Sequence, residues 1–505
     1  MTTEAEIVVS GAPLAVTQVV DIARHGARVR LDADAVAAMQ DSSAHVQELA
    51  RSERPVYGVS TGFGALATTY IPVERRADLQ RSVVRSHAAS NGAAVDREVV
   101  RALMALRLRT LATGHTGVRP VVAETLAALL NAGIEPTVRE FGSLGCSGDL
   151  APLAHVALAL MGEGETAHAM AAAGIAPVEL SEKEGLALIN GTEGMLAMLV
   201  LALHDLRRLV TTADVAASMS VEALLGTDRV FAADLQRLRP QPGQAVSAGN
   251  MRTVLAGSPI VESHRGPDDP RVQDAYSLRC APQVAGACRD TIEHAARVAA
   301  AELAAAIDNP VVLADGRIES NGNFHGAPVG YVLDFLAIAC ADLASMSERR
   351  TDRMLDKSRS HGLPPFLAAE PGVDSGHMIA QYTQAGLVSE MKRLAVPASV
   401  DSIPSSAMQE DHVSLGWSAG LKLRRSVDAL TRVLAIEILT AARALDLRAP
   451  LSPAPATAAV VQTLREHVPG PGPDRYLAPE LEAAVQAVRD RSLLAAAEAV
   501  TGPLA

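Results

Sequence analysis

Aromatic residues are scarce in this chain of 505 residues, which holds one tryptophan, six tyrosines and six phenylalanines. Strands favour aromatic side chains, whereas the abundant alanine and leucine favour tightly packed helices. The four cysteines, at positions 146, 280, 288 and 340, show no Cys-x-x-Cys or other metal-ligand spacing. We therefore expect a helical protein without a metal site, in a reducing compartment such as the cytoplasm.

An excess of basic residues is also absent, because 45 Lys and Arg face 57 Asp and Glu, a net charge of −12. This charge argues against a nucleic-acid partner. No uninterrupted apolar run reaches the roughly 18 residues that a membrane span needs. The acidic start, Met-Thr-Thr-Glu-Ala-Glu, lacks the basic end and apolar core of a signal peptide. We expect a cytoplasmic enzyme with no membrane partner.

No low-complexity linker divides the chain, but its two parts differ in pattern. Residues 1–110 mix short elements with loops, and the glycine-rich segment 54–72, which carries Tyr57, is predicted to be a mobile loop. It lacks the Gly-Lys-Ser/Thr ending of a phosphate-binding P-loop. Residues 111–505 are predicted to form a helical bundle domain, with turn-rich breaks at 239–249, 257–270 and 361–376. The predicted helices cover 97–111, 121–131, 150–161, 194–216, 289–307, 328–356 and 414–447.

Residues 142–154, Gly-Ser-Leu-Gly-Cys-Ser-Gly-Asp-Leu-Ala-Pro-Leu-Ala, form the most informative stretch. Gly145 and Gly148 allow a tight turn, and Asp149 is a favoured cap for the helix that follows. In such a turn the Gly148 amide nitrogen can attack the carbonyl carbon of Cys146. Loss of that oxygen and of the Ser147 hydroxyl as two waters leaves a five-membered ring with an electrophilic methylene. The alternative is an ordinary Gly/Ser turn before a capped helix.

This stretch is one of nine blocks, in order along nearly the whole chain, that resemble the histidine ammonia-lyase family of aromatic amino-acid lyases. The blocks are 57–64 (YGVSTGFG), 86–89 (SHAA), 142–155, 184–192 (EGLALINGT), 272–279 (VQDAYSLR), 308–310 (DNP), 322–325 (GNFH), 363–367 (LPPFL) and 409–414 (QEDHVS).

The resemblance implies a fold, a cofactor and an assembly. The fold is all-α, a large elongated helical bundle with a smaller mixed N-terminal region. Cys146-Ser147-Gly148 would mature into a methylidene-imidazolone (MIO) group, so that no external cofactor is required. The enzyme would be a homotetramer whose active sites draw residues from more than one subunit.

Elimination of ammonia removes a non-acidic β-proton while an amine leaves, and the MIO electrophile activates the substrate through either its amine or its ring. Tyr57 is the candidate base, although a phenol with a pKa of about 10 needs a positive environment to act near neutral pH. Glu410 is the alternative base. Taken alone, Tyr57 could equally be a packing tyrosine.

Further roles follow from the chemistry of the side chains and from the resemblance. The Arg279 guanidinium suits a substrate carboxylate, and Gln273, Tyr276 and Arg279 share helical spacing. By resemblance, Tyr276 and Asn190 flank the MIO oxygen. Also by resemblance, the carboxylate and amine are oriented by Gln273 and Asn309, Phe324 shields the group from water, Met378 packs against the substrate ring, and Gln409 binds substrate.

The choice of substrate depends on two polar side chains. An imidazole ring carries a donor and an acceptor, which His87 and Glu410 can satisfy. A phenylalanine-directed pocket would be apolar there, because an unpartnered buried carboxylate is costly. The prediction is conversion of L-histidine to trans-urocanate and ammonia. A tyrosine or phenylalanine lyase, a 2,3-aminomutase and a non-catalytic helical homologue stay open.

Several residues depart from the commoner family pattern, among them Arg109, the turn at 114–117 and three residues near the presumed site. Cys146 stands where alanine is usual, but ring closure uses its main-chain atoms and a small thiol should be tolerated. His377 replaces an apolar residue beside the presumed ring pocket and is expected to influence pH dependence or substrate preference. Glu193 stands where an amide is often seen.

Overall fold

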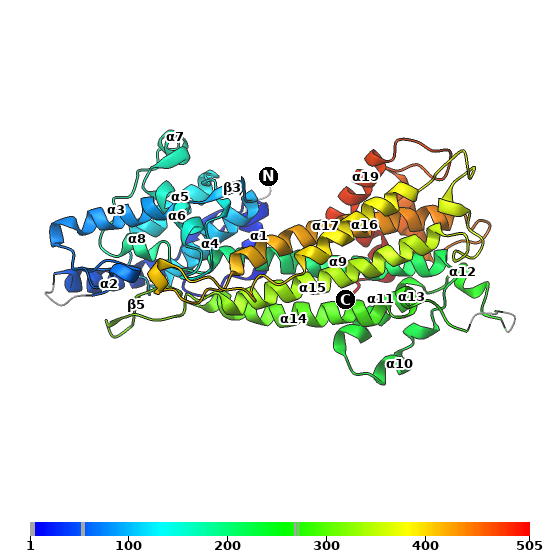
Figure 1. Cartoon of the computed structure of the whole chain (residues 1–505), viewed down its shortest axis with the longest axis horizontal. Helices are drawn as coiled ribbons and strands as arrows, with labels where there is room; N and C mark the ends of the chain where they lie inside the picture. Colours follow the sequence, from blue (N-terminus) through cyan, green and yellow to red (C-terminus); the bar gives the residue numbers. More distant parts are fainter. Residues whose placement is uncertain (1–5, 52–55, 267–268, 270–271) are drawn as a thin grey trace. The chain divides into compact units, whose positions relative to one another are not determined.

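The computed structural model describes residues 6–51, 56–266, 269 and 272–505. Helices make up most of this part of the chain, which confirms the all-α prediction (Figure 1). Strands in the described residues form only three two-stranded sheets. They pair β1 (Ile7–Val9) with β2 (Val29–Leu31), β3 (Asn91–Ala94) with β4 (Arg139–Phe141), and β5 (Val311–Val312) with β6 (Ile318–Glu319).

The chain divides into two compact units that alternate along the sequence. Unit 1 comprises Met1–His204, Ala295–Asp334 and Pro397–Leu421, and unit 2 comprises Asp205–His294, Phe335–Val396 and Lys422–Ala505. The division of the sequence at residue 110 stays a prediction. Four long helices contribute residues to both units: α9 (Glu193–Ala223), α14 (Ala281–Ala304), α15 (Ala327–Leu355) and α17 (Gly416–Asp446).

Unit 1 packs short helices around the buried helix α4, and α3 lies against α6 and α8 (Figure 1). Its helices are α1 (Val16–Arg24), α2 (Ala33–Ala50), α3 (Arg76–His87), α4 (Arg97–Ala112), α5 (Pro120–Ala132), α6 (Leu150–Leu160), α7 (Ala167–Ala172) and α8 (Glu184–Ala187). Its 3₁₀ turns are η1 (Gly64–Leu66), η2 (Val73–Arg75), η3 (Gly164–Thr166) and η6 (Ser406–Met408).

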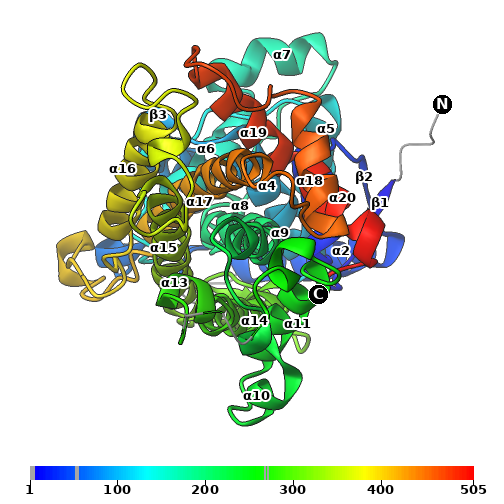
Figure 2. The ribbon, with the colours of Figure 1, turned by 90° about the vertical axis from the view of Figure 1, so that its right-hand side faces the viewer.

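Unit 2 is helical as well, with α18 and α20 side by side (Figure 2). Its helices are α10 (Ala233–Arg237), α11 (Pro242–Val254), α12 (Pro259–Glu262), α13 (Tyr276–Arg279), α16 (Met378–Leu394), α18 (Pro455–Arg465), α19 (Ala478–Arg489) and α20 (Ser492–Thr501). Its 3₁₀ turns are η4 (Arg229–Phe231) and η5 (Pro365–Leu367).

All seven predicted helices are present, although α14 begins eight residues before the predicted start at 289. Two expectations were wrong. The predicted break at 239–249 is largely helix α11, because Pro242 occupies a first-turn position where its missing N–H does no harm. The region before residue 110 also contains α2, a helix of 18 residues. Residues 54 and 55 of the predicted Tyr57 loop lie outside the described residues, as do residues 267, 268 and 270 of the predicted break at 257–270.

Helix α4 places Arg101, Arg107 and Arg109 in the core of unit 1, where each binds backbone carbonyls. Arg101 donates to the carbonyls of Ile22 and Leu130, and Arg109 to those of Gly11 and Ala304. The Ala304 carbonyl belongs to the last turn of α14, where helical carbonyls lack partners. These arginines therefore join segments that are distant in the sequence.

By length and composition alone, one described helix could cross a membrane. An 18-residue window of α15 has a mean hydropathy of 1.6, although no uninterrupted apolar run in the sequence is that long. Within the structure, 61% of that window is buried. A core helix of a globular protein has the same property.

A fully buried ion pair joins Lys183, just before α8, to Asp308. The Lys183 ammonium also donates to the Thr116 carbonyl at 2.7 Å, and the other Asp308 oxygen accepts from the Asn309 amide at 2.8 Å. Removing one charge of such a pair leaves the other without compensation in the core.

Lys183→Met should therefore destabilise unit 1 by about 3–5 kcal/mol. The double variant Lys183→Met/Asp308→Asn carries no unpaired charge and should recover much of the loss. Urea unfolding of the three proteins checks this. Equal midpoints for wild type and Lys183→Met would show that the pair contributes nothing to stability.

Candidate active site

The turn at residues 145–148 is pressed against the backbone at Gly191. Gly145 and Gly148 have φ angles of +65° and +76°, as the glycine pattern predicted. A Cβ atom on Gly148 would lie 2.0 Å from the Gly191 carbonyl oxygen, so no side chain fits there. The next amide, that of Asp149, donates to the same oxygen at 2.7 Å. The turn is therefore in direct contact with the segment at Gly191 through main-chain atoms.

Asp149 precedes α6 as predicted, but its carboxylate does not cap the helix. Instead, one oxygen accepts from the Ser143 hydroxyl at 2.9 Å and the other from the Met195 amide at 2.8 Å. Complete burial raises the pKa of Asp149 to about 7, and the nearby Glu193 carboxylate adds to this rise. The Asp149 carboxyl is therefore a buried group that ties the turn to the start of α9.

A cavity of about 450 Å³ opens beside Ser147, within unit 1. One face of α3 forms a wall, with residues at the spacing i, i+3, i+4, i+7 and i+8. Five predicted site residues line the cavity: Tyr57, His87, Ser147, Asn190 and Glu410. The other lining residues are Gly62, Phe63, Gly64, Leu66, Thr69, Ile71, Leu79, Ser82, Val83, Ser86, Leu150, Leu186, Ile189 and Ser406.

Two of these residues have hydrogen bonds that orient their polar atoms. His87 ends α3, and its Nδ1 lies 2.8 Å from the Val83 carbonyl. A carbonyl only accepts, so Nδ1 carries the proton and Nε2 of the neutral ring is an acceptor. The Tyr57 hydroxyl accepts from the Gly64 amide at 3.2 Å, and its ring meets Phe63 edge-on.

Glu410 lies between the cavity and the turn. Its Oε2 accepts from the Ser405 hydroxyl at 2.7 Å. Burial and the adjacent Glu410 carboxylate raise the pKa of the Cys146 thiol to about 12. Cys146 is therefore a neutral thiol that packs with Val413 and Leu415, in agreement with its interpretation as a small buried apolar residue.

Asn190 is fixed by the Asn309 segment and by Arg107. Its side-chain amide donates to the Asn309 carbonyl at 3.1 Å. The completely buried Arg107 donates to the carbonyls of Asn190 and Ile307 at 3.0 and 3.2 Å. The same guanidinium pairs with Glu193 at 2.8 Å. The ion pair thus contacts Asn190 directly and the segment of Asn309 through the Ile307 carbonyl.

The remaining predicted site residues do not line this cavity. Phe324 and Gln409 belong to unit 1, in the turn before α15 and directly after η6. Four others belong to unit 2: Gln273, Tyr276, Arg279 and Met378. The helical spacing proposed for three of them is wrong, because α13 begins only at Tyr276 and Gln273 precedes it. The Arg279 guanidinium lies 4.6 Å from the centre of the Tyr276 ring.

The surroundings of His377 do not support its expected influence on the pH dependence of the reaction. It is 2% exposed, and its Nδ1 lies 3.2 Å from the Thr440 hydroxyl. Burial, together with Arg443, Arg465 and Arg475, lowers the pKa of His377 to about 3. His377 is therefore neutral in the range in which a histidine ordinarily titrates.

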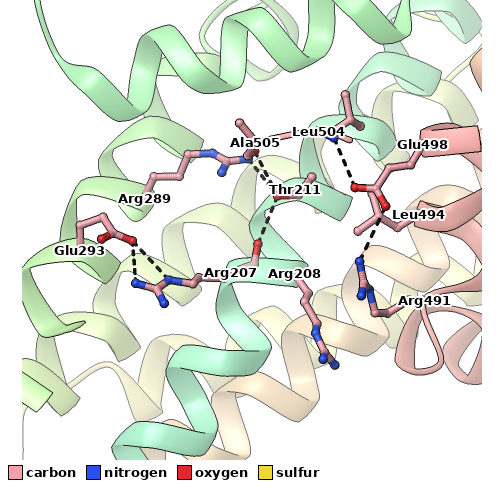
Figure 3. Close-up of a pocket in the computed structure, with 10 residues that line it drawn as sticks. All are labelled: Arg207, Arg208, Thr211, Arg289, Glu293, Arg491, Leu494, Glu498, Leu504 and Ala505. Carbon is pink, nitrogen blue, oxygen red and sulfur yellow. Dashed lines mark hydrogen bonds and ion pairs between the residues drawn. The ribbon is translucent and has the colours of Figure 1, made fainter. Parts of the chain in front are cut away.

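A second cavity, of about 330 Å³, lies in unit 2 (Figure 3). Arginines line it, but Arg207 pairs with Glu293 at 3.0 Å and Arg491 lies 3.7 Å from Glu498. Arg289 pairs with Asp214 at 2.6 Å. Because these arginines pair with carboxylates of unit 2, we interpret their charges as part of its packing. Across residues 6–51, 56–266, 269 and 272–505, no group of His, Cys, Asp and Glu is arranged to hold a metal ion.

Sequence reasoning missed the α3 wall and the polar groups behind the turn. The apolar and small residues of α3 at 79, 82, 83 and 86 share the helical face of His87, so periodicity was an available signal. Arg107 carried no such signal, because its partners lie at positions 187, 190, 193 and 307.

Comparison with known proteins identifies the family. The aromatic amino acid lyase model matches residues 14–466, and the chain belongs to this family of carbon–nitrogen lyases. Enzymes of the family generally depend on MIO.

Individual relatives cover almost the whole chain. It is 65% identical over 512 residues to a histidine ammonia-lyase of Streptomyces griseus, covering 99% of each chain. Its structure is similar to that of a tyrosine aminomutase from Streptomyces globisporus (TM-score 0.93, 37% identity, 99% and 100% coverage). It is also similar to histidine ammonia-lyase from Trypanosoma cruzi (TM-score 0.90, 35% identity, 98% and 95% coverage).

The low pKa of His377 makes a prediction about acid stability. The unfolded chain binds the proton below a pKa of about 6.5 and the folded chain only near 3, so this residue destabilises the fold as pH falls below about 6.5. The effect at pH 5 is about 2 kcal/mol. His377→Gln should therefore lose less thermal stability than wild type between pH 7 and pH 5. Parallel curves for the two proteins would contradict the buried, neutral state.

Proposed function

We propose that this enzyme eliminates ammonia from L-histidine and releases trans-urocanate. The observation that carries the proposal is that Ser147, His87 and Glu410 line one cavity. The 65% identity to the Streptomyces griseus enzyme supports it. An aminomutase reaction is the alternative, supported by the structural similarity to the tyrosine aminomutase at 37% identity.

The residues at the turn fit the MIO group. The main chain of Cys146, Ser147 and Gly148 would form its ring and the Ser147 side chain its methylene, and the close approach to Gly191 leaves room at position 148 for glycine alone. When formed, the group supplies an electrophilic methylene that activates the amino acid for loss of its amine. The N-terminus of α6 follows the turn and contributes partial positive charge there.

Other residues of the chain would bind the substrate and move protons. Tyr57 would take the β-proton, with Glu410 as the alternative base. His87 and Glu410 would hold the imidazole ring, since a carboxylate oxygen can accept an N–H and the bond at Nδ1 fixes the orientation of the His87 Nε2. Asn190 would lie beside the MIO oxygen.

The residues outside the cavity are proposed to complete the site in a homotetramer. Arg279 and Asn309 would bind the carboxylate and amine together with Gln273, and Tyr276 would flank the MIO oxygen. Phe324, Met378 and Gln409 would enclose the ring. The 69% exposed Tyr276 ring, in unit 2, is consistent with a role at a subunit contact. We further propose a cytoplasmic location and the predicted division of the chain at residue 110.

Product analysis tests the reaction. The purified enzyme should form urocanate and ammonia from L-histidine, and neither cinnamate nor coumarate from phenylalanine or tyrosine, because the pocket carries an acceptor for imidazole N–H groups. Urocanate absorbance and chromatography of the products check this. A β-amino acid product would instead support the aminomutase, and no product from histidine would refute the proposal.

Ser147→Ala tests the turn. The variant should fold like the wild type but lose almost all activity, because the methylene carbon comes from the serine side chain. Turnover and circular dichroism check this. Cys146→Ala is the matched control, since it keeps every main-chain atom used in ring closure and should still lose two waters. An active Ser147→Ala variant would exclude the proposed electrophile.

A further inference from the structure

The segment that carries Glu410 has an unusual backbone. Ser406, Ala407 and Met408 have φ angles of +50°, +52° and +66° in succession, although none is glycine. Left-handed conformations are unfavourable for side-chain-bearing residues, by roughly 1–2 kcal/mol each. Three consecutive examples persist only where surrounding interactions hold them, as is common at binding sites.

Ser405 and Glu410 close this turn at both ends. The Ser405 amide donates to the Glu410 carbonyl at 2.9 Å, and the Glu410 amide donates to the Ser405 carbonyl at 3.3 Å. The Ser405 hydroxyl also donates to Glu410 Oε2 at 2.7 Å. The two backbone hydrogen bonds fix the position of Glu410 at the end of the turn. The hydrogen bond from the Ser405 hydroxyl fixes the orientation of the Glu410 carboxylate.

The two described partners of the Glu410 carboxylate are neutral groups. One is the Ser405 hydroxyl, and the other is the Cys146 thiol of the turn at Ser147. A cationic partner would compete with a substrate N–H for this carboxylate, whereas a hydroxyl occupies one lone pair and leaves others available.

The same turn contacts the Tyr57 loop. Turn η6 packs on η1, and a Cβ on Gly64 would lie 2.9 Å from the Ser406 hydroxyl oxygen. The Gly64 amide donates to the Tyr57 hydroxyl. The turn that directs Glu410 is thus in contact with the segment that holds Tyr57.

We propose that Ser405 is a positioning residue for substrate recognition: its hydroxyl and the left-handed turn 406–408 direct the Glu410 carboxylate toward the ring of the bound amino acid. The inference rests on the proposed function, since it assigns Glu410 to the imidazole ring. It adds a residue that need not touch the substrate and explains why a strained turn is retained beside the cavity.

Ser405→Ala removes the hydroxyl, and Ser405→Thr keeps it. Threonine suits the extended backbone at this position, where φ is −135° and ψ is 178°. Ser405→Ala should raise the KM for histidine about tenfold, the effect of one hydrogen bond to a charged group, with a smaller change in kcat. Ser405→Thr should restore the wild-type KM. Both should show wild-type loss of two waters and wild-type melting temperatures.

The backbone is tested separately at the exposed Ala407. Ala407→Gly should keep the KM of the wild type, because glycine adopts the left-handed conformation without penalty. Ala407→Val should raise KM as Ser405→Ala does, since a β-branched residue disfavours this conformation. An unchanged KM in Ser405→Ala, or an equal defect in Ser405→Thr, would overturn the positioning role. The wild-type control separates the two questions, because failure of the wild type to form urocanate refutes the proposed function itself.

Discussion

The contact between the backbones of Gly148 and Gly191 is the constraint on which the rest of the site depends. On one side, a Cβ at position 148 would meet the Gly191 carbonyl at 2.0 Å. On the other, a Cβ at position 191 would lie 1.9 Å from the Glu193 carboxylate, which pairs with Arg107. The turn, the segment 190–191 and the buried ion pair are therefore stacked without space for any side chain between them.

Arg107 also determines where the neighbouring segments lie. Its guanidinium binds the carbonyls of Asn190 and Ile307, so it holds Asn190 next to the loop that leads to Asn309. Buried ion pairs contribute little net stability because desolvation opposes their attraction. Their value here is geometric, since a planar guanidinium with five donors fixes several acceptors at once. Behind the site, Lys183 and Asp308 form a second such pair.

The sequence predicted the long helices well because their periodicity is a local property. The sequence-based prediction was wrong at α11, which begins at Pro242. The next residue, Gly243, allows a close approach of two backbones, because a Cβ atom there would lie 2.3 Å from the Gly286 carbonyl oxygen. Both residues resemble turn residues in a sequence. The prediction that Asp149 caps α6 was wrong for another reason. The Asp149 carboxylate binds the Met195 amide, 46 positions away, and no amide of α6. Five predicted site residues meet at one cavity. The α3 wall was accessible from helical periodicity, whereas the contacts of Arg107 reach 83 positions along the chain to Asn190. The bond from Ser405 to Glu410 is local, but it requires the left-handed turn between them, which no sequence pattern indicates.

The central claim is that this packed turn becomes an electrophile made from the chain itself. The mass of the tryptic peptide 140–183 from the wild-type protein tests it most directly, because that peptide contains the whole turn and ends at the next lysine or arginine, Lys183. The mass should be lower than the sequence value by two water molecules, with the loss located at residues 146–148. A peptide with the full sequence mass, from protein that is folded and active, would contradict it.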